Sequence, residues 1–327
     1  MRKNELKRLA DAICGLSAIE LATIKDVVDR RERTVEAEII ETEMAGHIKG
    51  CPHCHSHELN SAGSKNGRKR FRCKSCGKSF NGLTGTPLAG LHNADKFLAN
   101  AREMLAGNTV RKTAAVLGVH KNGVHKNTAF HWRHKFLEQI SEMQPDHLDG
   151  LVEADETYFL KSYKGQRTNL PRKAKKRGAP AKKRGLSDEQ VPVLVARNRT
   201  GGATLTAVLP SRKGKDIAEV LAPKISSESV LMTDGATAYR AVARAKKGVE
   251  VRVVPANPKG KTKGPNHINN VNAYDRGLKD WIYRFYGVAT KYLPHYLGWY
   301  RWLESHKGHN KASKFVADAA KPVKTGG

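Results

Sequence analysis

Apolar residues recur every three or four positions over much of the first 140 residues, a spacing typical of helices with one buried face. Residues 5–45 are predicted to form two helices that serve packing or self-association, and Ser17 with Glu20 fits a capping box opening the second. Further helices are predicted at 94–106, at 109–117 and in a segment that ends near residue 140. The first part of the chain is therefore predicted to be mainly helical.

After residue 150 the pattern changes to short segments rich in β-branched residues, separated by turns and helical stretches. Strands are predicted at 151–160, 191–198, 203–209, 230–233 and 250–254. This alternation predicts an α/β domain. Because 327 residues exceed the usual size of one domain, we expect a multidomain protein.

Four of the five cysteines fall into two close pairs, Cys51 with Cys54 and Cys73 with Cys76, separated by 18 residues. Two such pairs can each present two thiolates to one tetrahedral zinc ion, while the intervening residues form a hairpin. The spacing therefore predicts a zinc ribbon with a structural Zn²⁺. Nearby histidines are alternative ligands, less favoured because four thiolates already complete the shell: His53, His55 and His57.

The helices at 109–117 and before residue 140 are typical of a helix-turn-helix. Ala114, Val116 and Leu117 are expected to face the core. Helical bundles that do not touch DNA share this pattern. The positive charge of the whole chain is what favours the DNA-binding interpretation. The residues expected to contact DNA are Lys126, Arg133 and Lys135.

The turn between these helices contains a tandem repeat, in which residues 118–122 are repeated at 123–127. A helix-turn-helix needs only about 3 to 4 residues in its turn. Our hypothesis is a recent in-frame duplication that either extends the recognition helix or loops out, and that alters or weakens recognition of DNA.

Basic residues outnumber acidic ones by 59 to 31, giving a formal charge of +28. Such a field attracts polyanions, so nucleic acid is the leading partner; a ribosome-associated or merely basic protein is the alternative. Residues 161–184 hold eleven Lys or Arg and no acid, which predicts a mobile DNA clamp or, alternatively, a passive solubilising loop. The central cations of this run are Lys175, Lys176 and Arg177.

Two aspartates stand where metal-assisted phosphoryl transfer would need them. Asp155 interrupts an apolar strand and Asp234 ends another just before a glycine. A charge is costly there unless it binds something, and two-metal catalysis needs carboxylates around ions about 4 Å apart. A single acid at a strand end often only caps a helix. The two aspartates together are therefore stronger evidence for a metal site than either residue alone.

Several further segments carry a more specific likeness: Cys51–Cys54, Ser79–Leu88, Ala154–Thr157, Gly165–Arg167, His267–Asn272 and Gly287–Trp299. With these motifs the chain resembles, from about residue 5 to 305, the zinc-ribbon transposases of insertion-sequence family 1595 (ISXO-like).

The resemblance implies an RNase H-like core in which Asp155, Asp234 and Asn272 bind Mg²⁺ or Mn²⁺, while Lys279 contacts DNA near the reacting phosphate. It also implies binding to the terminal inverted repeats of double-stranded DNA, strand cleavage there, transfer to target DNA, and a homo-oligomer in the synaptic complex. Many relatives carry Glu where Asn272 stands, and an amide brings no negative charge. Assisting acids are therefore expected among Asp275, Glu304 and Glu153, although surface or salt-bridge roles are favoured for the first two.

The domain organisation expected from these features has five parts. They are a helical segment at 1–46, a zinc ribbon at 47–82, a helix-turn-helix at 93–145, an RNase H-like core at 150–307 with a basic insertion at 161–186, and a basic flexible tail at 308–327.

Two other function classes stay open. A catalytically inactive DNA-binding regulator derived from a transposase would keep every basic and zinc feature and would explain Asn272 and the repeated turn. A zinc-ribbon transcription or RNA-processing factor would predict no inverted repeats beside the gene. The chain shows neither a signal peptide nor a long apolar run, so we expect a cytoplasmic, nucleoid-associated bacterial protein that does not enter a membrane.

Overall fold

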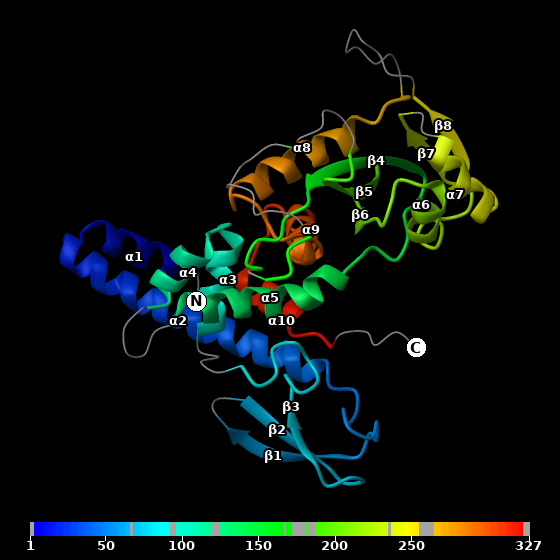
Figure 1. Cartoon of the computed structure of the whole chain (residues 1–327). Coiled ribbons are helices and arrows are strands. Elements are labelled where there is room, and N and C mark those ends of the chain that lie inside the picture. Colours follow the sequence, from blue (N-terminus) through cyan, green and yellow to red (C-terminus); the bar gives the residue numbers. More distant parts are fainter. Residues whose placement is uncertain are drawn as a thin grey trace. The chain divides into compact units, whose positions relative to one another are not determined.

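A computed structural model describes residues 3–65, 68–91, 96–118, 124–166, 168–171, 181, 187–234, 237–254 and 265–322 (Figure 1). The chain forms two compact units, one of Met1–Ala106 with Lys311–Pro322 and one built around Gly107–Asn310. None of the described helices is long and apolar enough to cross a membrane.

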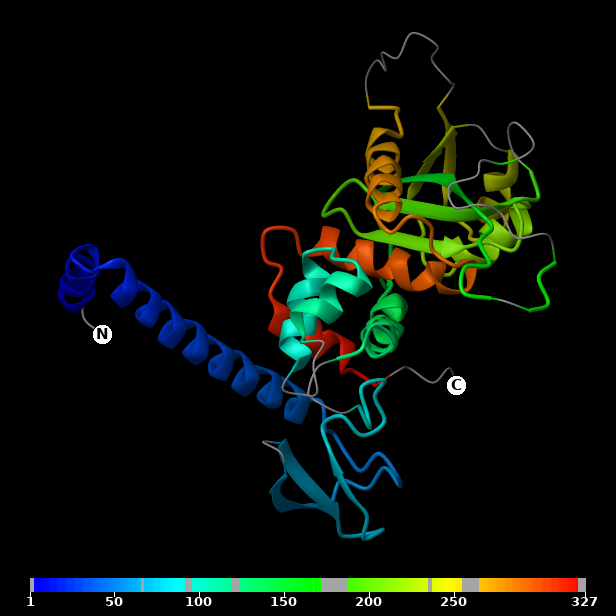
Figure 2. The same cartoon turned by 60° about the vertical axis from the view of Figure 1, so that its left-hand side comes forward.

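The first unit contains two amino-terminal helices, a small sheet and two further helices. Its elements are α1 (Lys3–Cys14), α2 (Ala18–Gly46), β1 (Leu59–Lys65), β2 (Arg68–Cys73), β3 (Ser79–Asn81), α3 (Phe97–Leu105) and α10 (Ala312–Ala319). Ser17 and Glu20 form the predicted capping box, because the Ser17 side chain accepts from Glu20 N and the Glu20 carboxylate accepts from Ser17 N. Figure 2 shows α2 as one long helix whose amino-terminal half projects away from the ribbon.

The carboxyl-terminal segment differs from the expected flexible tail at 308–327. Its residues 312–319 form α10, which packs on α2 and α3. Phe315, Val316 and Ala319 are buried, and Asp318 is buried beside two lysines. The many lysines of this segment concealed a short apolar stripe that only packing makes visible.

The second unit begins with α4 (Val110–Val116) and α5 (Lys126–Glu142), so the expected helix-turn-helix region 93–145 is divided between the two units. Ala114 and Leu117 are buried as predicted, whereas Val116 is 56% exposed, which corrects the prediction for that residue. Of the tandem repeat, residues 119–123 lie outside the described residues, and α5 begins only at Lys126. Only Lys126 and Asn127 of the repeat therefore lie in the described helix.

The predicted α/β domain is built on a five-stranded sheet with the order β6-β5-β4-β7-β8. Its strands are β4 (Leu151–Leu160), β5 (Gln190–Asn198), β6 (Thr204–Val208), β7 (Val230–Thr233) and β8 (Glu250–Val253). The first three pair antiparallel, and β4, β7 and β8 pair parallel. All five strands lie within a residue or so of the predicted segments.

Helices cover both faces of this sheet (Figures 1 and 2). Beside one face lie α6 (Gly214–Leu221), the 3₁₀ turn η2 (Thr237–Tyr239) and α7 (Arg240–Ala245), which share a core with Val152 and Ala154 of β4. Side chains alternate along a strand, so Glu153 and Asp155 point to the other face. That face is covered by α8 (Asn269–Tyr283) and α9 (Leu293–Ser305), the latter following the 3₁₀ turn η3 (Thr290–Tyr292).

Helix α9 also packs closely against α5, and a glycine permits this contact. A Cβ atom added at Gly298 would lie 2.5 Å from Ser141 Cα. This crossing holds α5 firmly on the α/β core.

Candidate active site and zinc centre

The four cysteines meet at one point of the small antiparallel sheet. Their sulfur atoms all lie within 4.8 Å of one another, with Cys51 Sγ 3.6 Å from Cys76 Sγ and Cys54 Sγ 3.5 Å from Cys73 Sγ. A tetrahedral zinc ion with Zn–S bonds of about 2.3 Å needs sulfur separations of about 3.8 Å. The four thiols can therefore hold a zinc ion, and none of the three nearby histidines belongs to this group among the described residues.

The backbone of each pair prepares the thiols for a cation. His55 N donates to Cys51 O (2.8 Å) and Gly77 N to Cys73 O (3.0 Å), which closes a tight turn around each pair. Hydrogen bonds, first that from the amide of Cys76, lower the pKa of the Cys73 thiol, whereas the pKa of the neighbouring Cys54 thiol is raised, so the four thiols share their protons unequally. In the part of the ribbon that the structure describes, the apolar core is a very small cluster whose buried members are Cys51, Cys73 and Phe80, so a metal ion would have to stabilise this module.

Asp155 and Asp234 are brought together by the parallel pairing of β4 and β7. Val152 pairs with Leu231 and Glu153 with Met232, so two residues further on Asp155 and Asp234 come level on neighbouring strands. Backbones of neighbouring strands are about 5 Å apart, and level residues of a parallel pair point to the same face. The register thus places both carboxylates side by side, on the face covered by α8.

The electrostatics of Asp155 agree with this placement. Burial and, after it, the neighbouring Asp234 raise the pKa of Asp155 to about 6, whereas Lys279 of α8 opposes the shift. Glu156 lies on the opposite face near Tyr239 and Arg212, as strand alternation predicts. A half-buried acid beside a second acid is the environment in which a divalent cation gains most.

Glu153 fixes the position of α8, a role that the sequence did not reveal. Its side chain is completely buried, and it accepts hydrogen bonds from Asn270 N (2.8 Å), Asn270 Nδ2 (2.9 Å) and Val271 N (3.0 Å) at the first turn of α8. Arg199 Nε donates to the same carboxylate (2.7 Å), and Arg199 also donates to His267 O (2.7 Å). Glu153 thus caps a helix amino terminus, where a negative charge is favoured, and anchors α8 to β4.

The polar residues of α8 face the aspartates differently from what we expected. Asn272 is exposed, and in the part of the chain that the structure describes its side-chain amide makes no hydrogen bond. Asp275, three residues later, is buried, and its burial together with the neighbouring Asp155 raises its pKa to about 7. Lys279 is exposed and lies close enough to lower the pKa of both acids.

The expected DNA contact of Arg133 is wrong, because Arg133 is only 2% exposed. Its guanidinium donates to Asn108 O (2.6 Å) and lies over the Trp299 ring at 5.1 Å, which makes it part of the packing of α5 on α9. Lys126 is exposed, and Lys135 is paired with Glu138. The cations of the basic insertion, Lys175, Lys176 and Arg177, lie outside the described residues.

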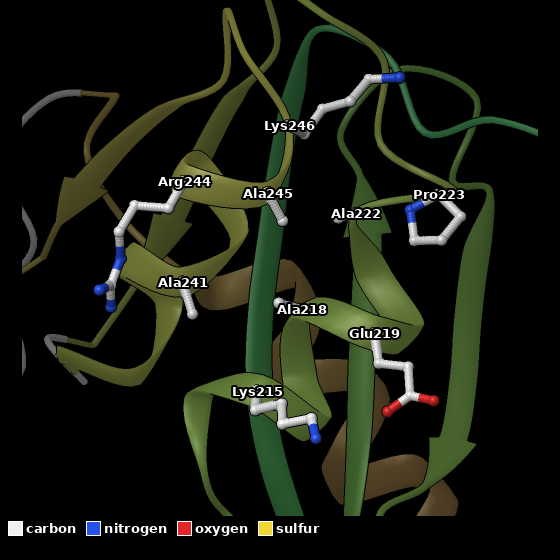
Figure 3. A pocket seen from close by; sticks show the side chains of 9 residues that line it. All are labelled: Lys215, Ala218, Glu219, Ala222, Pro223, Ala241, Arg244, Ala245 and Lys246. Carbon is white, nitrogen blue, oxygen red and sulfur yellow. The ribbon is translucent and has the colours of Figure 1, made fainter.

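A separate open hollow of about 1010 Å³ lies between α6 and α7 (Figure 3). Alanines form its floor, with Lys215, Glu219 and Arg244 around it. None of the aspartates described above lines this hollow, so the hollow is not part of the candidate site despite its volume.

Comparison with known proteins identifies the region that holds these aspartates. Residues 147–304 match the family model of the ISXO2-like transposase domain. Residues 147–304 therefore belong to this transposase domain family. The matched region of this transposase includes the whole five-stranded sheet, α8 and almost all of α9.

Two individual proteins are also similar to this transposase. An uncharacterized protein in transposable element ISH50 of Halobacterium salinarum is 26% identical over 254 residues, which cover 76% of the transposase and 82% of that protein. A chain in the cryo-EM structure of the simian T-cell lymphotropic virus intasome in complex with PP2A regulatory subunit B56 gamma covers 64% of the transposase and 70% of its own length. Its TM-score is 0.31 at 11% identity.

Proposed function

We propose that this transposase binds the terminal inverted repeats of an insertion sequence and catalyses metal-dependent DNA strand cleavage and strand transfer. The observation that carries the proposal is the register of β4 and β7, which sets Asp155 level with Asp234 beneath α8. The strand order, with three antiparallel strands followed by two parallel ones, supports assignment of this domain as an RNase H-like core.

The residues at this position fit divalent ions. Asp155 and Asp234 supply carboxylate oxygens, the donors that Mg²⁺ and Mn²⁺ prefer, and Asn272 offers an amide oxygen at the open end of the site. When bound, the ions supply activation of the attacking hydroxyl and stabilisation of the leaving oxygen.

The protein's own groups would bind and orient the DNA. In the first reaction a water oxygen attacks the phosphorus at the element end, the P–O3′ bond breaks, and a free 3′ hydroxyl leaves. In the second, that hydroxyl attacks a target phosphorus, so one P–O3′ bond forms as another breaks. Lys279 is exposed beside the aspartates, where its ammonium can hold the phosphate that reacts.

The remaining parts would hold the DNA. We assign the four-cysteine ribbon a structural Zn²⁺ and, together with α4 and α5, recognition of the element ends; of the cations expected there, Lys126 is exposed. Pairing of two ends implies a homo-oligomer in the synaptic complex. The formal charge of +28 supports contacts with both element-end and target DNA.

Cleavage of labelled end DNA tests the proposal. With Mg²⁺ or Mn²⁺, the wild-type protein should nick DNA that contains an element end, and Asp155→Ala or Asp234→Ala should abolish nicking. The control is Asp280→Asn, which alters an exposed aspartate of α8. Wild-type activity in Asp155→Ala or Asp234→Ala would contradict the mechanism.

A second candidate function is an inactive DNA-binding regulator, favoured by the neutral and exposed Asn272. It predicts end binding by the wild-type protein with no nicking under either metal. The same assay, combined with a gel-shift measurement, separates the two functions.

A further inference from the structure

Helix α8 carries three polar residues near the aspartates, Asn272, Asp275 and Lys279. With about 100° of rotation per residue, Asp275 lies about 40° around the helix from the buried Val271, and Asn272 about 100° from it. This difference explains why Asp275 is only 6% exposed while Asn272 lies at the exposed edge. Of the two, Asp275 is the residue that faces the sheet.

The carboxyl group of Asp275 lacks the partners that a buried acid normally has. Its Oδ1 atom is buried, and no described residue donates a hydrogen bond to it. The acid that acts on it most strongly is Asp155, whose like charge opposes its ionisation, and Lys279 only partly offsets this. A carboxylate in this position needs a cation.

Another buried aspartate of the same chain shows what a purely structural partner set looks like. Asp318 is 1% exposed, and its carboxylate lies 3.2 Å from Lys314 Nζ and 2.6 Å from Lys321 Nζ. Among the ion pairs of the described residues, none includes Asp275. Asp275 is therefore not placed to stabilise the fold.

We propose that Asp275 is a metal-binding carboxylate of the site, beside Asp155 and Asp234, and that it supplies the negative charge that Asn272 lacks. This inference rests on the proposed function, because it assigns a further ligand to the same divalent ions. It makes the site one of three acids and one amide, with the amide at the exposed edge.

Binding of Mn²⁺ to the zinc-loaded, full-length protein tests the inference without DNA or turnover. Free Mn²⁺ is measured by electron paramagnetic resonance for the wild type and for Asp275→Asn, Asn272→Ala, Asp155→Asn and Asp280→Asn. We expect Asp275→Asn to weaken binding at least about tenfold and more than Asn272→Ala does. Asp280→Asn, the exposed matched control, should stay within about twofold of the wild type because its charge is screened by solvent.

The Mn²⁺ measurement separates the role of Asp275 from the proposed function. If Asp155→Asn loses Mn²⁺ and Asp275→Asn binds it like the wild type, the role of Asp275 is overturned and the proposed function stands. If neither variant affects Mn²⁺, the metal site of the proposed function fails as well.

A measurement on the wild-type protein guards against a variant that does not fold. Fe²⁺ in place of Mn²⁺, with peroxide and ascorbate, generates hydroxyl radicals that cut the backbone near the bound ion. Cuts near residues 155, 234 and 275 are expected, and protection by excess Mg²⁺ should remove all three. Cuts near 155 and 234 without one near 275 would overturn the proposal.

Discussion

Glu153→Gln should destabilise the second unit, built around Gly107–Asn310, although the two side chains have almost the same shape. The carboxylate is 0% exposed, and each of its oxygens accepts two hydrogen bonds: Oε1 from Arg199 Nε and Asn270 Nδ2, and Oε2 from the amides of Asn270 and Val271. A glutamine turns one of these oxygens into an NH₂ group. Whichever oxygen is replaced, the two N–H groups that donated to it then face an NH₂ group, which is itself a donor.

The size of the effect follows from these contacts. A hydrogen bond to a charged group contributes about 1.5–3 kcal/mol, so two lost bonds cost about 3–6 kcal/mol. Removing one partner of a buried ion pair costs about 3–5 kcal/mol, and Arg199 has a side chain only 15% exposed. Because the two estimates describe the same loss, we expect a decrease of about 3–5 kcal/mol in the free energy of unfolding.

Urea unfolding gives the free energy, and hydrogen exchange of peptides covering α8 shows where the change occurs. The control is Glu138→Gln, which breaks the pair of Glu138 with Lys135; both side chains are partly exposed, so its effect should stay below about 1 kcal/mol. We expect faster exchange over residues 269–275 in Glu153→Gln. A loss of less than about 1 kcal/mol with unchanged exchange would refute the anchoring role of Glu153.

Three further outcomes are expected. The folded-state pKa of Asp275, about 7, lies above its ordinary value of 3.8, so the unfolded chain loses this proton first and stability falls as pH rises between these values. At about 1.4 kcal/mol per pKa unit, ionising Asp275 lowers the free energy of unfolding by up to about 4 kcal/mol at pH 8. Metal-free Asp275→Asn should therefore resist urea better than the wild type at pH 8 and gain less at pH 5.5. Equal stability of the two proteins at pH 8 would count against this. Chelation of zinc, or Cys73→Ser, should remove hydrogen-exchange protection over residues 51–80, since the ribbon's own core is small, and persistent protection would argue against a structural metal. Gly298→Ala should lower the free energy of unfolding by about 1–3 kcal/mol, and with it the thermal midpoint, because the new Cβ would lie 2.5 Å from Ser141 Cα. An unchanged midpoint would show that α5 can move away.

Features that depend on neighbours in the chain were readable from the sequence. The five strands, the capping box of Ser17 with Glu20 and the two cysteine pairs each follow from a local spacing, because strand alternation, helix caps and metal knuckles involve residues a few positions apart. The resemblance to a transposase family rests on short motifs of the same kind, and the match of residues 147–304 confirms it.

The tertiary structure decided how those elements face one another. Arg133 looked like a DNA contact and is buried against α9, while Glu153 gave no signal that it would cap α8. Asp275 differs from Asn272 by less than one helical turn, yet the packing of α8 buries the first and exposes the second. A residue's spacing along the chain fixes which element it belongs to, but its burial and charge environment depend on elements more than a hundred residues away, such as β4 for α8.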